Sequence, residues 1–254
     1  MRIDLNCDMG ESFGLWTMGA DDRVMPHITS ANVACGAHAG DPLVMRRTVR
    51  LASAANVAIG AHPGFADLQG FGRREMTVDP AELEASLIAQ IGALAAIARA
   101  EGVGLQHVKP HGALYNMAAR DRALSDAIAR AIAAVDRSLI LFGLPNSPIL
   151  EAGRAAGLRT AGEGFADRAY EPDGSLTPRS RSGAVIHDVD AVVSRAVRMA
   201  LDGIVLTPAG AEVPLHVDTI CVHGDTPGAA ELAQRIHDAL ERRGVTVSPV
   251  GAWL

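Results

Sequence analysis

The chain of 254 residues is 48% hydrophobic and 20% charged and has a formal net charge of −6, so it can bury a large core but has no basic surplus for nucleic acid. Its N-terminus lacks the apolar core of a signal peptide, and no run of about 18 apolar residues predicts a membrane span. Three cysteines without a CxxC pair argue against a secreted disulfide framework. We therefore expect a cytoplasmic protein without nucleic-acid or membrane partners, folded as a single domain over residues 1–254.

Short apolar runs alternate with longer segments of helical periodicity along the chain. Strands are expected near residues 2–7, 29–34, 57–61, 104–109, 138–142, 158–162 and 217–223, and helices near 41–55, 80–101, 121–135, 146–156, 189–201 and 227–243. This alternation is typical of parallel βαβ units. Seven strands suit an irregular, TIM-like (β/α) barrel better than an open sheet, but periodicity alone is compatible with both. Before the last strand, a hairpin is expected at 204–206 and 212–215.

Proline and glycine mark the expected helix boundaries. An N-cap residue followed by proline predicts helix starts at Asp41-Pro42, Asp79-Pro80 and Thr226-Pro227, and glycine predicts helix ends at Gly102, Gly157 and Gly244. These signals place the turns between the expected strands and helices.

Polar side chains gather where the expected strands end. In the first strand, Asp4, Asn6 and Asp8 alternate with apolar residues, which puts three polar side chains on one face. Further polar residues end the later strands: Asn32 and His38; His62; His107, Lys109 and His111; Glu163, Asp167 and Arg168; and His223 and Asp225. Because active sites of parallel barrels lie at the carboxyl ends of the strands, this pattern predicts an enzyme.

Lys109 is the sole lysine among 23 basic residues. Arginine replaces lysine at most solvated sites but not where a compact ammonium is needed, so a specific role for Lys109 competes with a bias of genome composition. Glycine and proline flank His62 and His111, which predicts fixed turns that present their imidazoles. His107, deeper in its strand, is expected to be structural.

Six blocks of the sequence resemble the LamB/YcsF family. They are Asn6 through Glu11, Asn32 through Asp41, Gly60 through Arg74, His107 through Asn116, Glu163 through Arg168 with Tyr170, and Cys221 through Asp225. Six long blocks in the family's order are highly specific.

The resemblance implies a seven-stranded barrel related to the glycoside hydrolase/deacetylase barrels. It also implies that the chain, as the A subunit of a 5-oxoprolinase with B and C subunits, hydrolyses 5-oxo-L-proline (pyroglutamate) to L-glutamate with ATP and Mg²⁺. The sequence contains neither GxxxxGK[ST] nor GxGxxG between a strand and a helix, so any ATP must bind by another route.

Chemistry suggests a role for each candidate side chain. Lys109 is expected to neutralise phosphate or a developing oxyanion, Asp8 and Glu11 to hold Mg²⁺ or position water, and His62 or His111 to transfer protons. The expected substrate- or phosphate-binding residues are Asn6, Asn32, His38, Glu163, Arg168, Arg179, His223 and Asp225. Of these, the two arginines suit a carboxylate or phosphate because the guanidinium binds anions in a bidentate manner.

Two alternative functions remain open at this point. One is a metal-dependent deacetylase or amidohydrolase that needs no ATP, with Asp8, His38 and His62 as ligands of Zn²⁺. The other is a non-catalytic carrier that binds substrate and docks partner subunits. The density of ionisable residues at the strand ends weighs against the carrier.

Overall fold

The computed structural model describes residues 1–222 and 228–254. Seven parallel strands form a barrel: β1 (Arg2–Met9), β2 (Ser30–Ala34), β3 (Ala58–His62), β4 (His107–Val108), β5 (Ile140–Gly143), β6 (Arg159–Phe165) and β9 (Thr219–Val222). Pairing of β9 with β1 closes it, with Asp4 in register with Thr219 and Cys7 with Val222. The barrel is therefore confirmed, and the open sheet is excluded.

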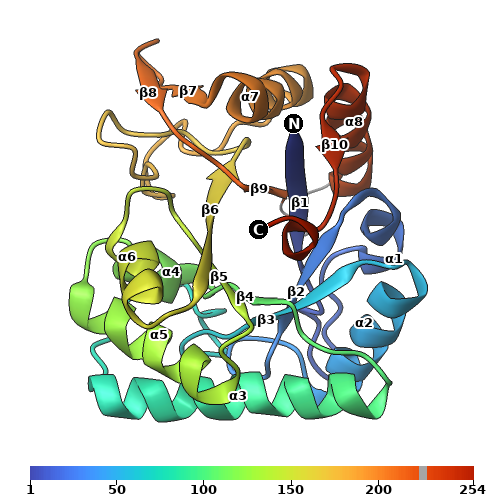
Figure 1. The fold of residues 1–254 in the computed structure, drawn as a ribbon, viewed down its shortest axis with the longest axis vertical. Helices are drawn as coiled ribbons and strands as arrows, with labels where there is room; N and C mark the ends of the chain where they lie inside the picture. Colours follow the sequence, from blue (N-terminus) through green and yellow to red (C-terminus); the bar gives the residue numbers. More distant parts are fainter. Residues whose placement is uncertain (223–227) are drawn as a thin grey trace.

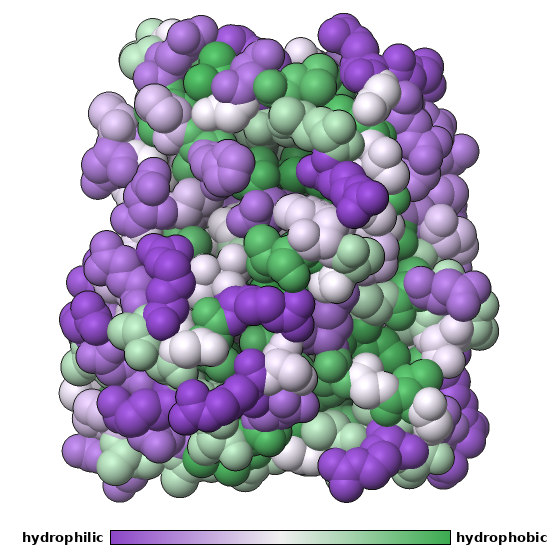
Figure 2. All heavy atoms as spheres, viewed as in Figure 1, coloured by the Kyte–Doolittle hydropathy of each residue, from purple (hydrophilic) through white to green (hydrophobic). Residues whose placement is uncertain are grey.

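Helices surround the barrel and confirm the six expected helical segments (Figure 1). They are α2 (Pro42–Ala54), α3 (Pro80–Ala100), α5 (Arg122–Val135), α6 (Pro148–Ala155), α7 (Val189–Asp202) and α8 (Ala229–Arg242). In the view of Figure 1, α3 and α5 pack together at one end of the molecule, and α7 and α8 pack together at the other. Figure 2 shows this face with hydrophilic side chains along both sides and a mixture of hydrophobic and hydrophilic side chains between them.

The predicted helix boundaries that lie within the described residues are confirmed. The Asp41 carboxylate accepts hydrogen bonds from the backbone N–H groups of Leu43 and Val44, and that of Asp79 accepts one from Ala81. Gly102, Gly157 and Gly244 follow their helices with positive φ. Thr226-Pro227 lies outside the described residues. Asp and Pro therefore fix these two helix starts locally.

The expected hairpin is also present, as the antiparallel pair β7 (Ile204–Leu206) and β8 (Glu212–Pro214). Several short elements were not predicted: α1 (Asp21–Val24), α4 (Gly112–Ala118), β10 (Thr246–Val247) and the 3₁₀ turns Met25–His27 and Val250–Ala252. Of these, α4 matters most for the site, because it starts directly after His111.

Helix α3 is the one helix of the described residues that is long and apolar enough to cross a membrane, with a mean hydropathy of 1.4. Its buried side chains include Leu83, Leu87, Ile91 and Leu94, which belong to the main hydrophobic core. The helix packs against α5, α2 and β3. In this structure it is a helix of the layer around the barrel.

The alternation in β1 separates the core from the site. Ile3, Leu5, Cys7 and Met9 are buried in the hydrophobic core. The intervening Asp4, Asn6 and Asp8 contact polar side chains of other strands, which places them inside the barrel. One strand thus supplies both apolar packing outside the barrel and polar groups inside it.

Candidate active site

Lys109 lies at the centre of a polar cluster at the carboxyl ends of the strands. Its Nζ is 2.8 Å from Asp8 Oδ1 and 2.9 Å from Glu163 Oε1. It also lies 3.1 Å from Cys221 Sγ and 3.4 Å from Asn6 Oδ1. The lysine side chain is 3% exposed and that of Glu163 is fully buried, so this ion pair is shielded from solvent.

The neighbours of Lys109 favour its protonated form. Burial alone lowers the pKa of a lysine, but Asp8, Cys221 and Glu163 raise that of Lys109 well above its ordinary value. Burial raises the pKa of the Cys221 thiol well above its ordinary value, although Lys109 opposes the shift. The lysine is therefore an ammonium that can stabilise negative charge and is not a base.

The buried side-chain amides of Asn6 and Asn32 form a hydrogen-bond network next to Asp8. Asn32 donates from Nδ2 to Asp8 Oδ1 at 2.8 Å and to Asn6 Oδ1 at 2.7 Å. Asn6 in turn donates to Thr219 Oγ1 at 2.7 Å, which ties β1 to β9. Both amides are predicted substrate ligands; in this structure Asn32 holds the Asp8 carboxylate, and Asn6 joins Asn32 to Thr219.

His107 lies under this network, as expected for a structural residue. Its Nε2 is 2.7 Å from Asn32 Oδ1, and its ring stacks on Phe142 with 4.2 Å between centroids. Burial, with a contribution from Lys109, lowers its pKa to about 3, so the ring is neutral. Gly60, next to His107 across the β3–β4 pair, has no side chain, and a Cβ there would overlap the imidazole.

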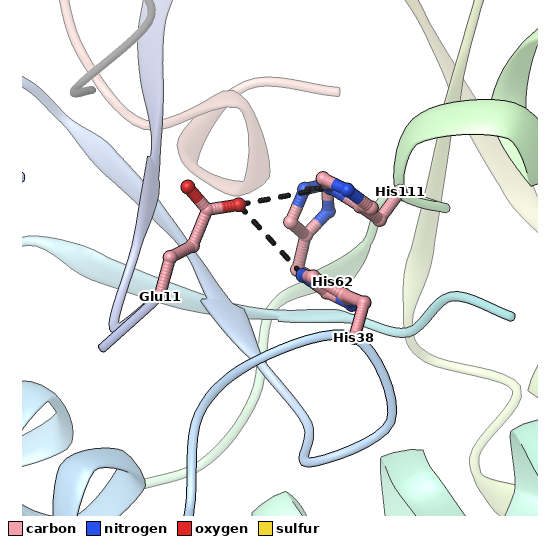
Figure 3. A group of neighbouring side chains, drawn as sticks. All are labelled: Glu11, His38, His62 and His111. Atoms are coloured by element: carbon pink, nitrogen blue, oxygen red, sulfur yellow. Dashed lines mark hydrogen bonds and ion pairs between the residues drawn. The ribbon is translucent and has the colours of Figure 1, made fainter. Parts of the chain in front are cut away.

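A second cluster adjoins Asp8 and contains Glu11, His38, His62 and His111, all buried (Figure 3). His62 Nε2 is 3.3 Å from Asp8 Oδ2 and 3.0 Å from His111 Nδ1. The Glu11 carboxylate approaches from the end of β1, with Oε1 3.6 Å from His111 Nδ1 and 3.7 Å from His38 Nε2. Ligand atoms of all four residues lie within 4.8 Å of one another.

Two of these histidines are held in fixed orientations by backbone carbonyls. His62 Nδ1 is 2.7 Å from the carbonyl oxygen of Lys109, and His111 Nε2 is 2.8 Å from that of Phe71. The rings of His38 and His111 stack with a centroid separation of 3.7 Å. Burial lowers the pKa of His111 to about 3 and that of His38 well below its ordinary value.

Two glycines make room for this stack. A Cβ on Gly72, whose φ is +61°, would lie 2.9 Å from both His111 Cδ2 and His38 Cβ. A Cβ on Gly64 would lie 3.0 Å from His38 Nδ1. Three glycines of the sequence block Gly60 through Arg74, namely Gly60, Gly64 and Gly72, are thus explained by close approach to imidazoles.

The remaining predicted site residues either lie away from the Lys109 and histidine clusters or fall outside the residues that the structure describes. The Arg168 guanidinium donates to the carbonyl oxygens of Thr177 and Ala184, so two of its N–H groups hold a loop. Burial, Arg179 and other neighbours lower its pKa to about 10, and Arg179 itself is exposed. His223 and Asp225 lie outside the described residues.

The expected zinc ligands Asp8, His38 and His62 are brought together only in part. The structure groups the two histidines with Glu11 and His111. It places Asp8 against Lys109 and Asn32 through Oδ1 and 3.3 Å from His62 Nε2 through Oδ2. The sequence analysis assigned no role to Cys221, whose Sγ contacts Lys109 Nζ. Its signal was the register of β9, because Cys221 pairs with Asn6 and shares its inward side.

Comparisons with known proteins agree over the whole chain. The model of the LamB/YcsF family matches residues 3–254. The A subunit of 5-oxoprolinase from Symbiobacterium thermophilum is 55% identical over 99% of this chain and 96% of its own length. That of Pyrococcus furiosus is 54% identical over the full length of both chains.

Solved structures give the same picture. The crystal structure of a lactam utilization protein from Thermus thermophilus matches with a TM-score of 0.93 and 49% identity, covering 98% of this chain and 99% of that one. A putative cellobiose-phosphate cleavage protein from Enterococcus faecalis covers 99% of this chain and 98% of its own, with a TM-score of 0.57 and 11% identity. The second match shows a shared fold alone.

Proposed function

Because this chain belongs to the LamB/YcsF family, we propose that it hydrolyses 5-oxo-L-proline to L-glutamate, coupled to ATP hydrolysis, as the A subunit of a multi-subunit 5-oxoprolinase. The observation that carries the proposal is the full-length similarity to relatives named as the A subunit of 5-oxoprolinase. A related solved structure is named a lactam utilization protein, and 5-oxoproline is a lactam. The cluster around Lys109 supplies groups suited to this reaction.

Lys109 serves as the electrostatic group in the proposed reaction. When ATP phosphorylates the lactam oxygen and water adds to the ring carbon, negative charge lies on the phosphoryl group that this oxygen carries. A buried ammonium near that oxygen stabilises the charge more strongly than water does, because the surroundings are of low polarity. Asp8 and Glu163 keep the lysine protonated and limit its movement.

Asp8 is the group that positions water. Its side chain is 13% exposed, whereas that of Lys109 is 3% exposed, so the carboxylate reaches further toward solvent. Oδ1 is held by Lys109 and Asn32, which leaves the carboxylate in a fixed orientation. A carboxylate held in this way is suited to accept a proton from an attacking water.

The C–N bond then breaks, and the ring nitrogen must receive a proton to leave as the amino group of glutamate. His62 lies 3.3 Å from Asp8 Oδ2 and can relay the proton taken from water, and His111 lies next along the same path. The ATP-coupled reaction consumes two waters, one that adds to the ring carbon and one that releases inorganic phosphate, and it restores the protonation of both groups.

ATP and Mg²⁺ belong to the proposal as co-substrate and its cation. Carboxylate oxygens are ligands that Mg²⁺ prefers, and Asp8 offers one at the mouth of the barrel. Phosphorylation of the amide oxygen would supply the driving force for opening an unstrained five-membered ring.

A second candidate is a metal-dependent amide hydrolase that needs no ATP. The specific observation in its favour is the group of Glu11, His38, His62 and His111. In that reaction a bound metal would activate water, and Lys109 would keep its electrostatic role.

The test is co-expression of this chain with its B and C subunits, followed by measurement of glutamate and ADP formed from 5-oxoproline. We expect equal amounts of both products, and a turnover at least about 100-fold lower for Asp8→Asn, the typical scale for a positioned acid–base group. Glutamate formed without ATP would favour the amide hydrolase. A complex that assembles but forms no glutamate would refute both candidates.

A further inference from the structure

The histidine pair His62 and His111 has an unusual arrangement of ring nitrogens. A carbonyl oxygen can only accept a hydrogen bond, so His62 donates from Nδ1 to Lys109 and His111 donates from Nε2 to Phe71. A neutral imidazole has one N–H. The other nitrogen of each ring, Nε2 of His62 and Nδ1 of His111, therefore carries a lone pair, and these two atoms face each other at 3.0 Å.

Two lone pairs at this separation repel each other unless a positive charge lies between or beside them. The Glu11 carboxylate approaches the same place, with Oε1 3.6 Å from His111 Nδ1. We propose that His62 Nε2, His111 Nδ1 and Glu11 Oε1 bind one divalent transition-metal ion of the zinc class. The alternative source of positive charge is one extra proton shared by the two histidines.

The distances fit such an ion. Zinc bonds to histidine nitrogen and carboxylate oxygen are about 2.0–2.2 Å long, so neighbouring ligand atoms of a tetrahedral site lie about 3.4 Å apart. Among the three ligand atoms, the separations of 3.0 Å for His62–His111 and 3.6 Å for His111–Glu11 lie on either side of this value, and His62 and Glu11 lie within 4.8 Å of each other. Small side-chain movements are enough to reach it.

The two backbone carbonyls add the outer contacts that metal sites need. A metal-binding histidine generally donates its other ring N–H to a carbonyl or carboxylate, which fixes the tautomer and the orientation of the ring. Lys109 and Phe71 provide these carbonyls. Imidazole nitrogens with one carboxylate favour zinc and similar transition metals over Mg²⁺, which prefers oxygen ligands.

His38 is not one of the proposed metal ligands. Its ring is parallel to that of His111, with an angle of 1° between the planes, so an ion in the plane of one ring lies outside the plane of the other. Both nitrogens of His38 are buried and have no hydrogen-bond partner among residues 1–222 and 228–254. Zinc with three protein ligands keeps a fourth position for water, and such a water would give His38 a partner.

Metal binding at this site can be tested apart from the lactam reaction, because it needs neither substrate nor partner subunits. An ion on these nitrogens would take the place of the proton relay through His62 and His111. The full-length chain is stripped with a chelator and titrated with Zn²⁺ by calorimetry, and bound metal is counted by mass spectrometry. We expect one ion per chain. His62→Gln, His111→Gln and Glu11→Gln each weaken binding by more than about 100-fold, since even outer contacts contribute about 10- to 100-fold. His38→Gln has a smaller effect.

His107→Gln is the matched control, because His107 is also buried but is held by Asn32 and Phe142. It should bind Zn²⁺ as the wild type does. Failure of the wild type to bind one Zn²⁺, or equal binding by the His62 and His111 variants, overturns the proposal and favours the shared proton. Should a variant not fold, histidine ¹⁵N NMR of the wild type decides. Added Zn²⁺ should shift Nε2 of His62 and Nδ1 of His111 but not the signals of His107, and unshifted signals overturn the proposal.

Discussion

At the scale of single residues, the burial of Lys109 links stability to activity. The ammonium is 3% exposed and contacts the carboxylates of Asp8 and Glu163. Removing one partner of a buried pair leaves the other charge uncompensated, which costs more than the pair itself contributes. A variant at Lys109 therefore changes both the fold and the reaction, and the two effects have to be separated.

We expect Lys109→Met to lower the free energy of unfolding by about 3–5 kcal/mol, because it leaves two carboxylates without their buried counter-charge. Turnover should fall by at least about 100-fold in this variant and in Lys109→Arg, since even ~1 Å of misplaced charge can cost that much. Urea denaturation and turnover in the assembled complex measure the two effects.

The double variant Lys109→Met/Glu163→Gln separates the effect on stability from the effect on turnover. It should regain part of the lost stability, because fewer buried charges stay unpaired, but it should not regain turnover. Wild-type turnover in Lys109→Arg would show that the sole lysine has no specific role in the reaction.

At the scale of secondary-structure elements, close contacts between neighbouring strands position the site. Gly60 of β3 makes room for the ring of His107 on β4, and His107 in turn supports Asn32 on β2. At the other end of the barrel interior, the Asp4 carboxylate of β1 accepts hydrogen bonds from Ser30 of β2 and Thr219 of β9. Each contact joins nearby strands, so each can be tested through stability.

Gly60→Ala should destabilise the protein by about 1–3 kcal/mol, the usual cost of overpacking a filled interior. The added methyl would overlap the His107 ring, which cannot move easily because it is stacked on Phe142. Gly104→Ala is the control, because no atom lies within 4 Å of a Cβ at that position. Thermal or urea unfolding of both variants is the measurement, and equal stabilities would contradict the proposed role of Gly60.

Asp4 predicts a pH dependence of stability. Burial raises its pKa to about 6 from an ordinary value of 3.8, although hydrogen bonds from Thr219, Thr29 and Ser30 oppose the shift. Between about pH 4 and 6 the folded state therefore keeps a proton that the unfolded chain has released, so stability from this group falls as pH rises. The total loss is roughly 3 kcal/mol, since each pKa unit corresponds to about 1.4 kcal/mol.

Asp4→Asn removes this titration. The stability of the variant relative to the wild type should rise across the same pH window and then level off. Urea unfolding of both proteins at a series of pH values is the measurement. Parallel pH profiles would mean that Asp4 does not keep its proton in the folded state.

At the scale of the whole molecule, the barrel gathers the site but the proposed reaction depends on partners. The relatives that match this chain over its length are named as one subunit of 5-oxoprolinase. When a co-substrate or a closing surface comes from another chain, the groups of one chain can be in place without turnover. The described cluster of Asp8, Lys109 and Glu163 is fully formed in the single chain.

We expect the isolated chain to form little glutamate from 5-oxoproline and ATP, and activity to appear when the B and C subunits are added. A complex containing Lys109→Met in place of the wild-type chain is the control that assigns the activity to this chain. Robust ATP-dependent turnover by the chain alone would contradict the expectation.

The sequence alone determined those features that depend on near neighbours in the chain. Alternating apolar patterns predicted the seven strands and the six long helices, because side-chain periodicity reports directly on strands and helices. Asp41 and Asp79 marked helix starts because an N-cap acts within three residues. Short elements such as α4, with seven residues, were missed because they contain too few residues to show a period.

Only the tertiary structure decided which polar residues meet. Closure of the barrel between β1 and β9 places Cys221 beside Lys109, and Glu163 reaches the same ammonium from β6. Barrel closure also groups Glu11 with three histidines, whereas the zinc site expected from the sequence had Asp8 as its carboxylate ligand. These contacts join residues many positions apart, and their partners depend on strand register and on the direction of each side chain. Neither property is a function of local sequence, so the positions of the ionisable groups were predictable but their pairing was not.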